Sequence, residues 1–141
     1  MRWIHLVETR KILWIEDSAY TLRSLIRPLE KKGYRFTIAT NEKQALDILD
    51  NDTFDLILFD IIIPTGSDES EDFIEYVGVR LAKEIVNIRK ITTPIIVISV
   101  VNNPNIIKEF ESLNVAKILQ KGYILPSILE REVENIFKKI S

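Results

Sequence analysis

Short apolar segments alternate along this chain with longer amphipathic ones, and this alternation limits the fold more than any other feature of the sequence. The apolar runs are rich in β-branched or aromatic residues and end in polar or turn-forming residues, as β-strands do. They cover residues 12–15, 34–39, 54–59, 94–98 and 115–119. The segments between them have the spacing of amphipathic helices. Strand and helix in turn predict a parallel sheet with helices on both faces.

Several residues mark where the helices begin and end. Gly33 is expected to cap the first helix at its C-terminus, and Asn41, with Gln44 three residues later, to cap the start of the second. Pro104 is expected to open the fourth helix. Pro28 falls late in the first helix and should bend or shorten it. One face of the third helix is predicted to carry Val77, Leu81, Ile85 and Ile88, and one face of the last, from about Ser127, to carry Leu129, Val133, Ile136, Phe137 and Ile140.

Composition narrows the class of protein further. A chain of 141 residues is most simply one domain, and 19 basic against 21 acidic residues give a net charge of −2, which offers no nucleic-acid surface. The absence of cysteine excludes disulfides and thiolate metal sites. The first residues are too polar for a signal peptide or a membrane span. We therefore expect a cytoplasmic protein without a membrane or nucleic-acid partner.

One carboxylate stands in an unexpected place. The run FDLILFDIIIP, from Phe54 to Pro64, is almost wholly apolar except for Asp55 near its start and Asp60 in its middle. An unpaired charge buried in such a run would be costly. Asp60 comes at the end of the third predicted strand, and in open parallel sheets ligands bind outside the carboxyl ends of the strands. Asp60 is therefore expected at the rim of the core, where chemistry takes place.

Other polar residues occupy equivalent positions after the remaining strands. Glu16 and Asp17 follow the first strand, Ser99 ends the fourth, and Lys121 follows the fifth. Clustered carboxylates repel one another and raise each other's pKa unless a cation joins them. Hard oxygen ligands of this kind suit Mg²⁺.

In combination these residues resemble the receiver domain of two-component response regulators. The resemblance rests on Glu16 and Asp17 after strand one, Asp60 after strand three with Pro64 four residues later, and Ser99 and Lys121 after strands four and five. It implies a flavodoxin-like, doubly wound α/β fold, with five parallel strands in the order 2-1-3-4-5 and five helices in a three-layer sandwich. Residues 1–10 would be an N-terminal extension, and residues 11–141 the receiver domain with an acidic insertion at about 65–77.

The resemblance also implies roles for the residues at this edge. Asp60 would accept a phosphoryl group from a sensor histidine kinase, a phosphotransfer protein or a small donor such as acetyl phosphate. The chain would then be a signalling phosphoacceptor that assists its own phosphorylation and dephosphorylation, and not an enzyme. Mg²⁺ would be held by Glu16, Asp17, Asp60 and the backbone carbonyl of Ile62, while Ser99 and Lys121 would bind the phosphoryl oxygens.

Departures from the family pattern leave two other interpretations to weigh. Ile118 stands at a switch position that is commonly aromatic, Gly122 replaces a proline that usually follows a cis peptide, and Val100 is larger than the usual residue. Because of these changes, the chain could instead be a pseudo-receiver, that is, a protein-binding module that is not phosphorylated. A phosphatase of the haloacid dehalogenase type is disfavoured, because Ile62 occupies the place of its required second acid.

The spacing between Asp60 and Ser99 is longer than is usual in the family, and acidic residues at about 65–77 account for the difference. Gly78 matches the usual start of the third helix. The insertion is expected to be an exposed loop. The alternatives are that it gates access to the site or binds a partner. Downstream signalling would use the surface of helix four, strand five and helix five, with a homodimer possible. If the chain is full length, no effector domain follows.

Overall fold

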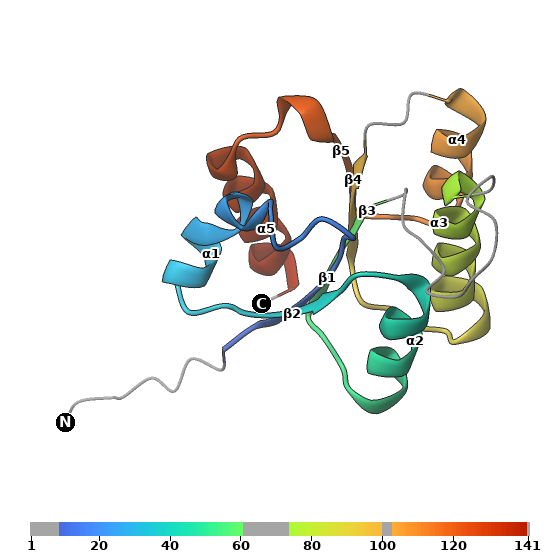
Figure 1. Ribbon diagram of the computed structural model, residues 1–141, viewed down its shortest axis with the longest axis horizontal. Coiled ribbons are helices and arrows are strands. Elements are labelled where there is room, and N and C mark those ends of the chain that lie inside the picture. The colour runs from blue at the N-terminus through green and yellow to red at the C-terminus, as the bar shows by residue number, and fades with distance from the viewer. Residues whose placement is uncertain (1–8, 61–73, 100–102, 141) are drawn as a thin grey trace.

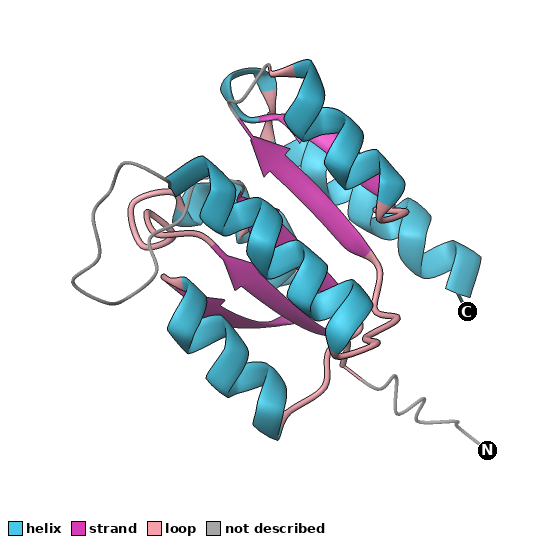
Figure 2. Ribbon diagram, turned by 90° about the vertical axis from the view of Figure 1, so that its right-hand side faces the viewer, coloured by secondary structure: helices cyan, strands magenta, loops and turns pink. Residues whose placement is uncertain are grey.

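The computed structural model describes residues 9–60, 74–99 and 103–140, with the side chains of 74–76 and 123 left aside. Five parallel strands form one sheet in the order β2-β1-β3-β4-β5. Their arrows run in the same direction in Figure 2. This order confirms the predicted doubly wound topology. The strands are β1 (Lys11–Ile15), β2 (Arg35–Ala39), β3 (Leu56–Asp60), β4 (Ile95–Ser99) and β5 (Lys117–Gln120).

Helices cover both faces of the sheet, as the three-layer prediction requires (Figure 1). On one side lie α1 (Arg27–Lys31) and α5 (Pro126–Ile140), and on the other α2 (Glu42–Asn51), α3 (Ile74–Lys83) and α4 (Pro104–Ser112). Within the described ranges, no helix is both long and apolar enough to cross a membrane. The described ranges also contain three shorter helical segments: the 3₁₀ helices η1 (Arg23–Leu25) and η4 (Lys121–Tyr123), and the π-helix η3 (Glu84–Ile88).

The central strands explain why their sequences lack polar alternation. Every residue of β3 and β4 is buried, because both faces of these strands are covered by helices. Alternate side chains enter two separate cores. Leu56 and Leu58 pack on the side of α1 and α5, and Ile57 and Phe59 pack on the side of α2, α3 and α4. Polar side chains are tolerated in these strands only at their carboxyl ends.

The predicted helix caps are confirmed. Gly33 adopts a φ of 97° after α1, a conformation that side-chain-bearing residues rarely take. The Asn41 side chain accepts a hydrogen bond of 2.8 Å from the backbone N–H of Gln44. The Gln44 carboxamide oxygen in turn accepts from the backbone N–H of Thr40. Pro104 occupies the first turn of α4.

The first helical segment differs from the prediction. A regular helix was expected to run through Leu22, Leu25 and Ile26 with Pro28 near its end. Residues 17–22 instead form turns, η1 follows, and Pro28 lies in the first turn of α1. Proline lacks the N–H that an interior position must donate, so the regular helix can start only at this point. The expected shortening is therefore confirmed, and the expected position of the proline is wrong.

The third helix also departs from the prediction at both ends. The expected start near Gly78 is wrong, because α3 already includes Ile74. At its other end α3 passes into η3, where the N–H of Arg89 bonds to the carbonyl of Glu84 at 2.8 Å. The wider π turn changes the phase of the side chains. Ile88 is consequently 70% exposed instead of continuing the buried face. In a different helix, α5, the terminal Ile140 is 49% exposed, although the sequence predicted it on the same face as the buried Leu129.

Gly33 and Gly122 allow a test of whether the positive φ of Gly33 requires a glycine. No heavy atom lies within 4 Å of a Cβ built on Gly33 or on Gly122, but only Gly33 has a positive φ. We expect Gly33→Ala to lower the free energy of unfolding by about 1 kcal/mol, since the cost is one of backbone strain. Gly122→Ala should leave it nearly unchanged. Urea unfolding of both variants would measure the difference, and equal stability of the two would contradict the assignment.

Candidate functional site

The site lies at the carboxyl edge of the sheet, where three strands bring charged residues together. Glu16 directly follows β1, Asp60 is the last residue of β3, and Lys121 directly follows β5. Side chains alternate between the two faces of a strand, so residues two apart share a face. The residues two positions earlier are Trp14, Leu58 and Leu119, and all three pack on the side of α1 and α5.

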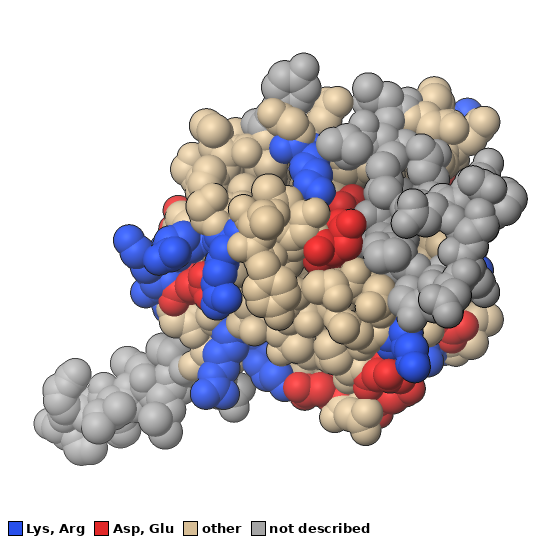
Figure 3. Space-filling model, in the orientation of Figure 1, with Lys and Arg blue, Asp and Glu red and all other residues tan. Residues whose placement is uncertain are grey.

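Three carboxylates meet at this edge, as the sequence predicts. One oxygen from each of Glu16, Asp17 and Asp60 lies within 4.8 Å of the others. Glu16 is 2% exposed and Asp60 4% exposed, whereas Asp17 faces solvent. The space-filling view shows acidic atoms gathered at the centre of the face that looks onto this edge (Figure 3). The group is therefore open to solvent at Asp17.

Lys121 supplies the positive charge that the buried carboxylates need. Its Nζ lies 2.7 Å from Oε1 of Glu16 and 2.9 Å from Oδ2 of Asp60. The lysine side chain is itself only 24% exposed. A buried carboxylate is tolerable when a charged donor pairs with it. This pairing answers the question that the apolar run around Asp60 raises.

The charges at this edge are not balanced by Lys121 alone. Burial, together with the neighbouring Asp60, raises the pKa of Glu16 to about 8, while Lys121 opposes the shift. Burial alone would lower the pKa of Lys121, but its hydrogen bonds to Glu16 and Asp60 outweigh burial and raise it. When all three carboxyl groups are ionised, the single ammonium of Lys121 leaves an excess of negative charge. A second cation would relieve it, and a set of hard carboxylate oxygens fits Mg²⁺.

Of the other predicted site residues, Ser99 is described by the structure and Ile62 is not. Ser99 is 3% exposed and pairs with Gln120 of β5, one residue beyond the pair of Asp60 with Ile98. It therefore lies at the same edge as Asp60. Ile62, predicted to offer its backbone carbonyl, lies outside the described residues, as does Val100.

Ile118 in β5 and Gly122 after it, the two residues there that depart from the receiver pattern, both lie in the described part of the chain. Ile118 is half-buried and packs into the core on the side of α2, α3 and α4. Gly122 sits in η4, and no cis peptide bond occurs in the described parts of the chain. No aromatic ring stands at position 118, so side-chain motion there would involve an aliphatic residue only.

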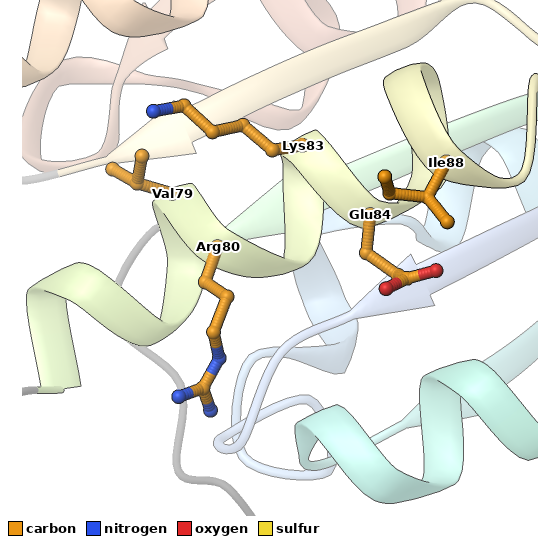
Figure 4. Close-up of a pocket in the computed structure, with 5 residues that line it drawn as sticks. All are labelled: Val79, Arg80, Lys83, Glu84 and Ile88. Atoms are coloured by element: carbon orange, nitrogen blue, oxygen red, sulfur yellow. The ribbon is translucent and has the colours of Figure 1, made fainter.

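A feature that the sequence did not predict is a shallow hollow on the outer side of α3. Figure 4 shows its lining side chains projecting from α3 and η3. Arg80 pairs with Glu42 of α2 at 2.7 Å, and Lys83 pairs with Glu109 of α4 at 2.9 Å. Because these cations already have carboxylate partners, the hollow presents little charge for a ligand. Its lining consists of Val79, Arg80, Lys83, Glu84 and Ile88.

Comparison with known families gives a match over most of the chain. The family of the response regulator receiver domain matches residues 12–131. The transcriptional regulatory protein CrdR of Helicobacter pylori is 29% identical over 128 residues, which cover 91% of this chain and 55% of that protein. The chain thus spans little more than half the length of this curated relative.

Solved structures agree with the fold. A two-component response regulator from Clostridium difficile superimposes with a TM-score of 0.77 at 26% identity, covering 94% of this chain and 99% of that one. A CheY-like response regulator receiver domain protein from Methanospirillum hungatei gives a TM-score of 0.74 at 23% identity, covering 93% and 96%. At the lower identity the likeness concerns the fold alone.

The raised pKa of Glu16 predicts how stability depends on pH when no metal is added. The carboxyl ionises near its ordinary pKa of 4.5 in the unfolded chain and near 8 in the folded one, so the unfolded state binds fewer protons between these values. Stability from this group is therefore present below about pH 4.5 and is lost as the pH rises to about 8. Glu16→Gln should flatten this decline, as measured by thermal unfolding in chelator at pH 5 and pH 8.

The exposed Glu111 of α4 offers a matched control for that experiment. Glu111→Gln should show the same loss of stability between pH 5 and pH 8 as the native chain. A Glu16→Gln variant whose decline equals that of the native chain would refute the assignment of this pH dependence to Glu16.

Proposed function

The chain belongs to the response regulator receiver domain family, and from this premise we propose that it accepts a phosphoryl group on Asp60 in a two-component phosphorelay. The observation that carries the proposal is the arrangement around Asp60, where Lys121 Nζ lies 2.9 Å from its carboxylate and the carboxylates of Glu16 and Asp17 lie alongside. In this role the chain is a phosphoacceptor that assists its own phosphorylation and dephosphorylation, and not an enzyme acting on a separate substrate.

The chemistry follows from the groups at the edge of the sheet. An oxygen of Asp60 attacks the phosphorus of a phosphohistidine or of acetyl phosphate, and the bond from phosphorus to the leaving nitrogen or oxygen breaks. Charge on the phosphoryl oxygens is the main obstacle, so positioned cations carry most of the catalysis. Lys121 already contacts Asp60 and would stay beside the transferred group.

A metal ion would take part in the same step. Glu16, Asp17 and Asp60 would hold Mg²⁺, together with the carbonyl of Ile62 if the family pattern applies, because their oxygens form a compact group open to solvent at Asp17. Bound there, the ion would neutralise charge on the incoming phosphoryl oxygens. Asp17 and Glu16 would then be freed of mutual repulsion, while Lys121 would remain available to the phosphoryl group.

Phosphorylation would act through a change of local charge. Ser99 ends the strand beside Asp60 and would donate its hydroxyl to a phosphoryl oxygen. That bond would draw the end of β4 toward Asp60 and shift the surface of α4, β5 and α5, where a downstream protein or a second copy of the chain would bind. A sensor histidine kinase or a phosphotransfer protein would be the donor, in the cytoplasm.

A pseudo-receiver that binds partners without phosphorylation is the alternative. Ile118 and Gly122 favour it, since both depart from the family pattern next to Lys121. Two observations weigh against it: Lys121 pairs with the buried Glu16 and Asp60, and Asp17 lies close to both carboxylates. A protein-binding module has no need of such a costly buried charge cluster.

Intact mass after incubation with Mg²⁺ and acetyl phosphate tests the proposal directly. The native chain should gain the mass of one phosphoryl group, and Asp60→Asn should not, because an amide cannot form the acyl phosphate. Asp47→Asn, on the exposed side of α2, is the control and should be modified like the native chain. Omission of Mg²⁺ should slow modification by a factor of about 10 or more.

Beryllofluoride distinguishes the two functions if acetyl phosphate gives no adduct. A complex of the native chain with Mg²⁺ and beryllofluoride, absent in Asp60→Asn, would keep the phosphoacceptor proposal and point to a narrow entrance. No adduct and no complex, in a chain that still binds Mg²⁺, would establish the pseudo-receiver instead.

A further inference from the structure

A buried aromatic pair joins the strand that carries Asp60 to the helix α4. Phe59 directly precedes Asp60 in β3, and its ring meets that of Phe110 in α4 edge to face, with centroids 6.1 Å apart and planes at 63°. Both side chains are 0% exposed. This geometry is the favourable one for two aromatic rings. The end of the functional strand is thus in direct contact with a helix that packs on one face of the sheet.

Phe59 and Asp60 point to opposite faces of the sheet because they are consecutive in a strand. Asp60 meets Lys121 at the edge toward α1 and α5, and Phe59 enters the core shared with α2, α3 and α4. A displacement of the backbone at Asp60 must therefore move the ring of Phe59. In a fully packed core such a movement is passed on to the neighbours and is not absorbed by empty space.

Phe110 is well placed to receive that movement. The buried side chains of α4 are Ile106 and Phe110, so the aromatic ring is a large part of what seats this helix on the sheet. The ion pair of Glu109 with Lys83 of α3 also joins α4 to its neighbouring helix, but it is exposed, and exposed pairs contribute little. Ile118, half-buried in the same core, brings no aromatic ring from β5.

We propose that Phe110 couples the position of α4 to the state of Asp60 through its contact with Phe59. When Asp60 carries a phosphoryl group or its analogue, the end of β3 adjusts to the new charge. The ring of Phe59 shifts with it, and α4 moves to a second packing arrangement because tightly packed interfaces are bistable. Phe110 is a positioning residue in this scheme and touches no reacting atom. The inference rests on the proposed function of Asp60 and adds the route by which its state reaches α4.

Hydrogen exchange of α4 with and without Mg²⁺ and beryllofluoride tests the coupling. In the native chain the backbone amides of α4 that follow Pro104 should change their exchange rates when the analogue binds. In Phe110→Leu that change should shrink by a factor of about three or more, since the leucine loses the ring contact. Binding of the analogue, followed separately by fluorine NMR, should persist in this variant because Phe110 lies outside the charged site.

A matched control comes from the other core. Phe137 of α5 is 4% exposed and packs edge to face on Tyr34, with centroids 5.3 Å apart. Phe137→Leu removes a comparable ring from a comparable contact, so it should lower stability in the same way as Phe110→Leu. It should leave the response of α4 unchanged. This control separates a specific coupling from general loosening of the fold.

A second pair of variants keeps the test decisive if Phe110→Leu does not fold. Phe110→Met preserves more of the volume, and Phe59→Leu removes the contact from the side of the strand. Each should reduce the response of α4, and the double variant Phe59→Leu with Phe110→Leu should reduce it no further than either single change.

The possible failures have separate meanings. If the native chain forms neither an adduct with acetyl phosphate nor a complex with beryllofluoride, the proposed function of Asp60 fails and the coupling fails with it. If the complex forms and α4 responds equally in the native chain and in Phe110→Leu, only the coupling is overturned. A complex that leaves the exchange of α4 unchanged in the native chain also overturns it.

Discussion

The ammonium of Lys121 between two buried carboxylates is the interaction on which the rest of this structure depends. Glu16 and Asp60 are separated from Lys121 by 105 and 61 residues, so they can meet it only when β1, β3 and β5 are assembled in register. Without that ammonium the end of β3 would place an uncompensated charge in an apolar core. The fold is therefore a condition for the charge cluster, and the charge cluster constrains how the strands can end.

Much of this architecture is encoded locally. The buried strands β3 and β4 are continuous apolar runs, and Gly33, Asn41 and Pro104 mark helix ends by their own backbone preferences. These signals act within a few residues, which is why a single sequence suffices to predict them. The broken first helix and the π-helix η3 are different. There, packing of the whole chain overrides local spacing, so the phase of Ile88 could not be read from its neighbours.

The site likewise has features that the sequence predicts and features that only the assembled fold determines. The identities of Glu16, Asp17, Asp60 and Lys121 follow from strand ends that a parallel sheet must bring to one edge. Their mutual distances do not follow, because these depend on side-chain conformations within the assembled edge. The bridge from Lys121 to Glu16, in addition to Asp60, is such a result. Contacts between distant elements, such as the ring of Phe59 on that of Phe110, depend on how α4 is seated and have no local signal at all.

Phe59 and Asp60 are consecutive in β3 but face opposite sides of the sheet, so they contact different groups. Asp60 faces the charged residues that follow β1 and β5, whereas Phe59 faces the apolar core under α4. A strand buried on both faces has no free volume in which to absorb a displacement, in contrast to the half-buried edge strand β2. A charge added at the end of β3 must therefore be accommodated on both sides of the sheet. If Asp60 is phosphorylated as proposed, burial of the whole strand, and not the chemistry of Asp60 alone, would carry the effect to a distant surface.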